Sequence, residues 1–225
     1  MTNRLGVPEH DLQLADRLQI NVWHSLYLYH DAPAFAPFDP PRRQVVRAGA
    51  LVLSHSPRAR KEPVWDTALF REMPNGLGRY AAAPGEEKHG IQRYRAGHVR
   101  ALFKLPGNLQ RYYSGHLAYL EVFKAFDTNL SPFTKLHSTQ PDFDSRNRRR
   151  VVVIPATDIV MACHLPPIFH RLDSELPLSA GMDLFAISKH FWLNHYSNHL
   201  IYQFMQHWWR RQPRLRERLE RYIRS

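Results

Sequence analysis

Cysteine and histidine are the side chains of this sequence that could hold a metal ion or act as a nucleophile. Cys163 is the only cysteine, and His164 follows it directly. Zinc ligands usually come as spaced pairs that reach one ion, whereas neighbours on the short helix expected here point in different directions. That helix would also place Cys163 at its C-terminal end, where the helix dipole disfavours a thiolate. The pattern therefore favours a buried cysteine over a metal ligand or a nucleophile.

Three further histidines, His190, His195 and His199, follow at spacings of five and four residues. His195 and His199 could share one face of a helix, as the two histidines of a HExxH zinc motif do. The glutamate of that motif is missing, and no third ligand is evident. We therefore predict no metal site and no cofactor.

Arginine side chains form two clusters that could bind phosphate groups bidentately. The first lies at an expected turn before a strand and comprises Arg146, Arg148, Arg149 and Arg150. The second lies on an expected C-terminal helix and includes Arg210, Arg211, Arg214 and Arg218. The alternatives are a solvated strand edge for the first cluster and a charged helix face for the second. The sequence alone leaves both alternatives open.

The overall charge also points to a polyanionic partner. The 225 residues carry a formal net charge of +11, which favours nucleic acid first and an anionic membrane second. Hydrophobic residues make up 44% of the chain, which is enough for a buried core. The sequence has no P-loop, GxSxG motif or glycine-rich dinucleotide fingerprint, so we predict that the protein is not an enzyme.

Cellular location is inferred from what the sequence lacks. Its N-terminus has no apolar stretch of the signal-peptide type, and no run of about 18 apolar residues occurs, so no transmembrane helix is expected. A single cysteine permits no internal disulfide, which fits a reducing compartment. We expect a nuclear or cytoplasmic protein, with the nucleus favoured.

The N-terminal half is expected to hold one helix and little regular structure after it. Apolar residues recur at spacings of three and four over residues 9–29, which predicts a helix packed on the core. The prolines of residues 32–43 indicate an extended connector, and residues 44–56 form a short apolar strand. Residues 57–96 lack any sustained period, so we expect a loop that is either functional or poorly ordered.

Alternation of apolar and polar residues becomes clear further along the chain. It predicts strands over residues 98–105, 116–126, 135–140 and 148–155, followed by a short helix over residues 156–164. Apolar residues then predict two amphipathic helices, one with Leu184, Ile187, Phe191 and Trp192, and one beginning near Ser197. Short strands at this spacing favour a small curved antiparallel sheet or a barrel-like core.

The expected fold class is therefore α+β. We divide the chain into an N-terminal helix (1–31), a connector with a short strand and a long loop (32–97), a β-core with a short helix (98–170), and a C-terminal helical extension (171–225).

Three segments together resemble the C-terminal region of fungal transposase-like proteins of the Plavaka/KDZ type. They are LAYLEVF (117–123), VVVIPATDIVMACHLPPIF (151–169) and FWLNHYSNHLIYQF (191–204). The sequence differs from the family pattern at Met161, where arginine is common, and in Leu165-Pro166-Pro167, where relatives usually have a hydrophobic residue before a single proline. The catalytic acids of such transposases lie upstream of this region. The resemblance therefore implies a detached C-terminal module, and no catalytic role is carried over to Asp142, Asp144 or any other residue.

These observations lead to one main hypothesis and two alternatives. The main hypothesis is a non-catalytic, transposon-derived module that binds nucleic acid non-specifically through its arginine clusters. The first alternative is a reader-like peptide-binding module with an aromatic pocket of Tyr112, Tyr113, Tyr119 and Phe123. The second alternative is a decayed transposase fragment without a selected function.

Overall fold

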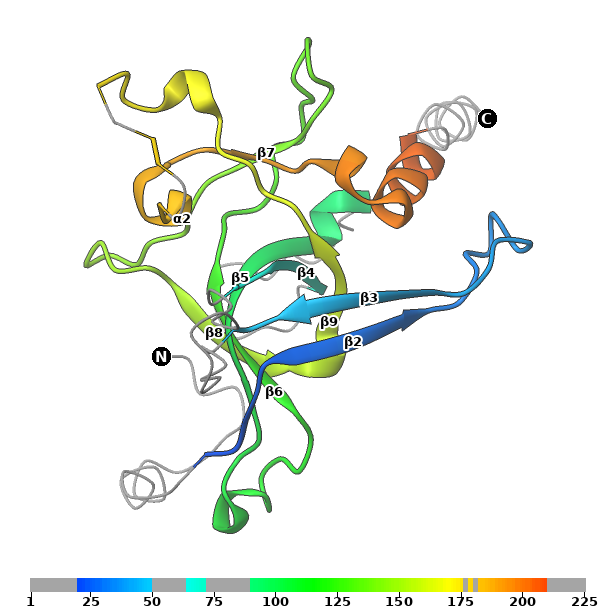
Figure 1. The fold of residues 1–225 in the computed structure, drawn as a ribbon, viewed down its shortest axis with the longest axis vertical. Helices are drawn as coiled ribbons and strands as arrows, with labels where there is room; N and C mark the ends of the chain where they lie inside the picture. Colours follow the sequence, from blue (N-terminus) through cyan, green and yellow to red (C-terminus); the bar gives the residue numbers. More distant parts are fainter. Residues whose placement is uncertain (1–19, 50–63, 72–89, 176–177, 180–181, 210–225) are drawn as a thin grey trace, which may run out of the picture.

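A curved antiparallel sheet forms the centre of the molecule (Figure 1). The computed structural model describes residues 20–49, 64–71, 90–175, 178–179 and 182–209. Within them the strands run in the order β8-β6-β5-β4-β9, and β1 pairs with β5 beside this path. Their bounds are β1 Val22–Trp23, β4 Thr67–Arg71, β5 Tyr94–Phe103, β6 Leu117–Val122, β8 Val151–Pro155 and β9 Ile159–Cys163.

The sheet confirms the α+β class but is not closed into a barrel. Strands β8 and β9 stand at opposite ends of the described strand order, although they are joined in the chain only by the 3-10 turn η5 (Ala156–Asp158). All neighbouring strands pair antiparallel. Register shifts within the β4–β9 and β5–β6 pairs mark β-bulges, which increase the local bend of a sheet.

A β-hairpin packs one of its faces on the central sheet. It consists of β2 (Ser25–His30) and β3 (Arg42–Arg47). Leu26 and Leu28 lie against the first hydrophobic core. The Gln44 side chain accepts a hydrogen bond from the backbone N–H of Ala162 in β9, at 3.1 Å. The hairpin is therefore fixed to the sheet by apolar contact and by one side-chain hydrogen bond.

The first core lies between the sheet and this hairpin. Its buried members share one face of the alternating strands and come from residues distant in the sequence. They are Val46, Ala48, Ala68, Phe70, Val99, Leu102, Ala118, Leu120, Val122, Val152, Ile154 and Ile159.

A second core lies on the other side of the sheet, under the C-terminal segments. It includes Leu69, Phe123, Phe191, Leu193, Ile201 and Met205. The segments that cover it are the short helix α2 (Leu184–Ile187), the two-stranded pair of β7 (Ser138–Thr139) with β10 (Phe191–Trp192), and a helix over residues 199–209. The 3-10 turns η6 (Phe169–Arg171) and η7 (His195–Ser197) connect them.

Two of the segments that carry the family resemblance lie side by side in this second layer. The backbone N–H of Ile168 donates to His190 O at 2.9 Å, and that of Trp192 donates to Pro166 O at 3.0 Å. The N–H of Asn194 completes the series by donating to His164 O at 3.0 Å. Residues 164–168 and 190–194 therefore run antiparallel along one another.

The helix predicted over residues 9–29 is wrong from Val22 onward, because these residues form β1 and β2. Residues 9–19 lie outside the described part. In SLYLYH the apolar leucines also alternate with tyrosines, and this period of two is the one that the fold uses. Pairing with β3 overrides the helical spacing.

The short helix predicted over residues 156–164 is also wrong. Only η5 is helical, and residues 159–163 form β9, which pairs with β4. Ile159 and Val160 are β-branched and suit a strand. A short apolar run does not distinguish a buried strand from a helix, and here the pairing with β4 decided the outcome.

The segment predicted to be a connector and loop contributes strands to both cores. Residues 64–71 contain β4, a nearly fully buried inner strand of the sheet, and β5 starts at Tyr94 after the 3-10 turn η3 (Gly90–Arg93). The strand predicted over residues 44–56 corresponds to β3, while its Leu51 and Leu53 lie outside the described residues.

The strands predicted near residues 98–105, 116–126, 135–140 and 148–155 are confirmed as β5, β6, β7 and β8. The helix predicted from near Ser197 is confirmed over residues 199–209. The helix predicted before it is limited to α2, because Phe191 and Trp192 form β10 instead. No helix in the described part is long and apolar enough to cross a membrane.

Candidate nucleic-acid interface

A groove of about 790 Å³ runs along β2. One wall consists of Trp23 and all six residues of β2. The opposite wall includes Tyr113, Gly115, His116, Ala156, Thr157, Ile159 and Val160. Successive residues of a strand point to opposite faces, so a groove that touches all of them follows the edge of the strand. The groove therefore lies beside the edge of β2 that faces away from β3.

The outer face of the β2–β3 hairpin presents aromatic rings to solvent. Tyr27 is 51% exposed and Tyr29 is 76% exposed, whereas Leu26 and Leu28 point inward. The Arg43 guanidinium lies over the Tyr27 ring, 5.2 Å from its centroid, in a cation–π contact. This face therefore combines flat, exposed rings with a cation.

Tyr113, Gly115 and His116, which follow the 3-10 turn η4 (Gly107–Leu109) in the chain, line one part of the groove. Trp23 contacts His116 edge to face, with ring centroids 4.8 Å apart. A Cβ atom added at Gly115 would lie 2.6 Å from the hydroxyl oxygen of Tyr113. Only glycine at this position therefore lets Tyr113 keep its place.

The other end of the hairpin is held by the helix over residues 199–209. The Phe35 ring stacks on His207, with centroids 4.1 Å apart. The Gln203 amide donates to Asp39 Oδ2 at 2.6 Å. Because the turn between β2 and β3 contacts this helix, both ends of the groove wall are fixed by other parts of the fold.

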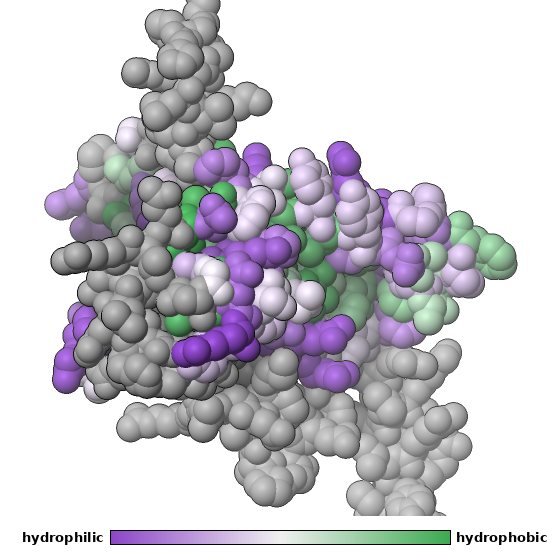
Figure 2. All heavy atoms as spheres, turned by 90° about the horizontal axis from the view of Figure 1, so that it is seen from below, coloured by the Kyte–Doolittle hydropathy of each residue, from purple (hydrophilic) through white to green (hydrophobic). Residues whose placement is uncertain are grey.

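Arg71 is the charged residue of the groove lining, and the acidic Asp158 lies in the chain between two residues of that lining, Thr157 and Ile159. The lining also includes His30 and His116, and no aspartate or glutamate belongs to it among the residues that the structure describes. In Figure 2 the hydrophobic residues of one face show between hydrophilic ones and do not form a broad apolar patch. A large continuous apolar patch would instead indicate a protein–protein interface.

The arginine turn predicted from the sequence is largely engaged with nearby side chains. Arg148 donates from Nε and Nη2 to Asp144 Oδ2, at 3.0 and 2.9 Å, and the Arg148 backbone N–H and guanidinium hold the pKa of Asp144 below its usual value. Asn147 adopts a left-handed backbone conformation with φ 57°, which asparagine tolerates in turns. Arg146 is exposed at this turn.

The next two arginines of the predicted cluster point into the protein. Arg149 lies 4.9 Å from the centroid of the Phe123 ring and 5.6 Å from that of Phe143, and burial lowers its pKa. Arg150 approaches Asp142 Oδ2 at 3.2 Å. The four arginines are thus neighbours in sequence but do not present one phosphate-binding face. The second predicted cluster, Arg210, Arg211, Arg214 and Arg218, lies outside the described residues.

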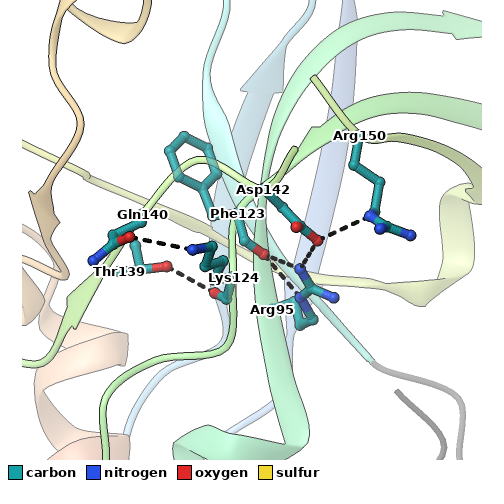
Figure 3. Close-up of polar contacts among 7 residues, drawn as sticks. All are labelled: Arg95, Phe123, Lys124, Thr139, Gln140, Asp142 and Arg150. Atoms are coloured by element: carbon teal, nitrogen blue, oxygen red, sulfur yellow. Dashed lines mark hydrogen bonds and ion pairs between the residues drawn. The ribbon is translucent and has the colours of Figure 1, made fainter. Parts of the chain in front are cut away.

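Asp142 belongs to a buried ion-pair network at the edge of the second core (Figure 3). Arg95 Nη2 contacts Asp142 Oδ2 at 2.9 Å, and both side chains are about 5% exposed or less. Arg95 also donates from Nε to the carbonyl oxygen of Phe123 at 2.8 Å. The network joins β5, the end of β6 and the segment before the arginine turn. The network therefore holds these three segments together.

Cys163 lies in β9 and is unsuited to nucleophilic chemistry. Burial raises the pKa of its thiol to about 12, although a contact with the Thr67 hydroxyl acts in the opposite direction. His164 faces Asn194, with Nδ1 and Nδ2 3.3 Å apart. No group of three or more histidine, cysteine or acidic side chains that could hold a metal ion occurs in the described ranges.

His137 and His195 are both buried beneath the helix over residues 199–209. Neither His137 Nε2 nor the two ring nitrogens of His195 has a hydrogen-bond partner among the described residues, while His137 Nδ1 contacts Asp127 O at 2.8 Å. Burial lowers the pKa of each imidazole, and the neighbouring His137 lowers that of His195 further. The rings of Tyr202 and Trp209 from the helix lie against His195.

We predict that acid weakens the packing around these histidines. Their pKa values in the folded protein lie below the unfolded value of about 6.5, so their contribution to stability is complete above pH 6.5 and falls as pH drops below it. Each unit of pKa depression corresponds to about 1.4 kcal/mol. Thermal unfolding between about pH 7.5 and pH 5.5 measures the loss of stability.

His195→Gln should flatten the dependence of the melting temperature on pH, whereas His199→Gln, at an exposed position, should leave it unchanged. Equal slopes for the two variants would contradict the prediction.

The residues of β2 that line the groove fall within the helix predicted over residues 9–29, so the sequence did not indicate this site. The signal was present in SLYLYH, where a period of two puts both tyrosines on the face opposite the leucines. The aromatic set predicted for a peptide pocket does not gather in one place. Tyr113 lines the groove, whereas Phe123 is fully buried in the second core.

Comparisons of the chain with models of protein families, with curated proteins and with solved structures gave no match.

Proposed function

We propose that this protein is a non-catalytic module that binds nucleic acid through the groove beside β2. The observation that supports this most is the composition of the groove. Aromatic rings and the cationic side chain of Arg71 line it, and no carboxylate does within the described part of the chain. Rings bind bases and cations bind phosphates, so both parts of a nucleotide find complementary groups. The formal charge of +11 adds a long-range attraction for polyanions.

The same composition argues against a pocket for a methylated, cationic side chain. Such pockets surround the cation with aromatic rings, which the groove could provide. Arg71 would repel a cation, and the described lining has no acid to offset the repulsion. Charge therefore favours an anionic ligand over the reader-like alternative.

The resemblance to fungal transposase-like proteins fits this proposal, because such proteins act on DNA. We propose a transposon-derived origin on that basis. Sequencing the genomic surroundings of the gene tests it, since an upstream reading frame with a catalytic transposase core is expected. In this proposal the arginines at 210–218 bind further phosphates along the strand.

Removing the cations near the groove should weaken binding and reduce its dependence on salt. For Arg43→Gln and Arg71→Gln, we expect lower affinity for labelled DNA and a smaller slope of log K against log salt, by about 0.7–0.9 for each phosphate that the variant no longer neutralises. Fluorescence anisotropy of the full chain, starting at about 50 mM salt, measures both quantities.

Arg148→Gln is the matched comparison, because Arg148 is exposed but paired with Asp144 away from the groove lining. An effect of Arg148→Gln as large as that of Arg43→Gln would assign binding to the arginine turn instead. Absence of any binding to single-stranded or duplex DNA at about 50 mM salt would overturn the proposed function.

An extended peptide is the second candidate ligand, supported by the position of β2 at a sheet edge. The N–H of Ala48 donates to His24 O at 3.0 Å, so in this antiparallel pair His24, Leu26 and Leu28 bond to β3. The backbone groups of Tyr27 and Tyr29 then point to the groove and could pair with an added strand. Competition of a neutral extended peptide with labelled DNA would favour this candidate.

A further inference from the structure

The walls of the groove restrict what can enter it. All six residues of β2 form one side, and the other side includes Tyr113, Gly115, His116, Ala156, Thr157, Ile159 and Val160. A volume of about 790 Å³ lies within the range of about 300–1,000 Å³ typical of pockets for drug-sized molecules. Such a space holds flat rings, which a base or a short run of unpaired nucleotides provides.

The rings along β2 are spaced for stacking. Tyr27 and Tyr29 are two residues apart on one face of a strand, so their Cβ atoms are separated by about 6.7 Å. That distance is twice the spacing of about 3.4 Å between stacked bases. One unpaired base could therefore lie between the two rings once the Arg43 guanidinium, which reaches Tyr27 from the position opposite Tyr29, has moved aside. Trp23, 37% exposed at the start of the wall, offers a third ring along the same direction.

The cations are placed beside these rings. The Arg43 guanidinium covers one side of Tyr27, and Arg71 lies in the groove lining. His116 adds a possible donor for phosphate oxygens without adding negative charge, whereas His30 Nε2 already pairs with Gln44 Oε1 at 3.1 Å. A strand whose bases stack on the tyrosines would thus have its phosphates near positive groups along its length.

We infer that the groove takes a single strand of nucleic acid, with unpaired bases stacked on Tyr27 and Tyr29. This inference rests on the proposed function and specifies its ligand. A duplex keeps its bases stacked on one another, so it offers phosphates to the arginines but no base faces to the tyrosines. Stacking is tolerant of sequence, because every base has an aromatic face. The site should therefore distinguish single strands from duplexes, but it should not distinguish one base sequence from another.

The test compares single-stranded and duplex ligands on the full chain. The probes are labelled oligothymidine, oligouridine and a mixed-sequence duplex, each of about 15 nucleotides per strand. Tyr29→Ala and Tyr27→Ala should each weaken binding of the single strands about 5- to 150-fold, the equivalent of about 1–3 kcal/mol per stacked base. Duplex affinity and the salt slope should stay unchanged, because no charge is removed.

Phe133→Ala provides the matched control. Phe133 is 95% exposed and does not line the groove, so its removal takes away an exposed ring at another place and should leave all three affinities unchanged. The exposed positions of both tyrosines let the variants fold, and equal melting temperatures check this. The comparison between oligothymidine and oligouridine separates a DNA ligand from an RNA ligand.

Different binding results would contradict the single-strand inference and the proposed function. Binding of single strand and duplex with equal affinity, unaffected by either tyrosine substitution, would overturn the single-strand inference and leave nucleic-acid binding intact. Binding of none of the three probes would overturn the proposed function itself.

Discussion

Asp142→Asn should lower the free energy of unfolding by about 3–5 kcal/mol, the range found when one partner of a buried ion pair is removed. Asp142 is 2% exposed and contacts Arg95, which is 4% exposed, at 2.9 Å. Asparagine keeps the size of the side chain but removes its charge. The Arg95 guanidinium would then stay buried beside a neutral amide, and the attraction that offsets its desolvation would be lost.

Denaturant unfolding followed by circular dichroism measures this effect. Asp144→Asn is the control, since Asp144 pairs with Arg148 at the exposed turn, where water and salt screen the interaction. Loss of the exposed pair should lower the free energy of unfolding far less than loss of the buried pair. A double variant, Arg95→Met with Asp142→Leu, should recover much of the loss, because it removes both buried charges. Similar effects of Asp142→Asn and Asp144→Asn would contradict the prediction.

The location of this network illustrates what the sequence could not reveal. Arg146, Arg148, Arg149 and Arg150 stand out as a cluster because they are neighbours in the chain. Arg95 lies outside that cluster, yet it contacts Asp142 across 47 residues. Which arginine is buried depends on partners that only the fold brings close. Local charge density therefore indicated a basic turn but gave no information on which side chains remain available to a ligand.

The elements that were predicted correctly have a strong local period. In β8 burial alternates so that Val152 and Ile154 point inward, whereas in β5 a bulge between Val99 and Ala101 shifts the alternation and buries Leu102. The helix over residues 199–209 places Ile201 and Met205 in the second core at a spacing of four. In each case the hydrophobic pattern and the tertiary contacts favour the same structure, so the pattern was sufficient.

The errors fell where local pattern and tertiary pairing disagree or where the pattern is short. The strand β2 was hidden by a helical spacing that continues from the preceding residues, and β4 by the proline- and glycine-rich sequence around it. The candidate groove depends on both errors being corrected, because β2 forms its wall and Arg71 ends β4. No prediction from sequence could place Tyr27 and Tyr29 at a strand edge once they were assigned to a helix.

Phe191→Ala should destabilise the protein by about 3–5 kcal/mol, the usual cost of removing a buried phenyl ring. Phe191 is fully buried and meets Phe123 edge to face at 5.5 Å and Phe185 stacked at 5.2 Å. These three rings join β6, α2 and β10. The alanine variant therefore leaves a cavity at the point where the C-terminal segments meet the sheet.

Phe169→Ala is the control, because Phe169 carries the same ring in the same layer but is 57% exposed. Its removal creates little cavity and should change stability by less than about 1 kcal/mol. Denaturant unfolding followed by circular dichroism measures both variants. If the two substitutions cost the same, the second core does not hold that layer. If only Phe191→Ala is costly, the layer is part of the folded unit, and the helix that supports the β2–β3 turn is held with it. The shape of the groove beside β2 would then depend on a phenylalanine on the opposite side of the sheet. Phe191→Ala should therefore also lower the affinity of the groove for its ligand.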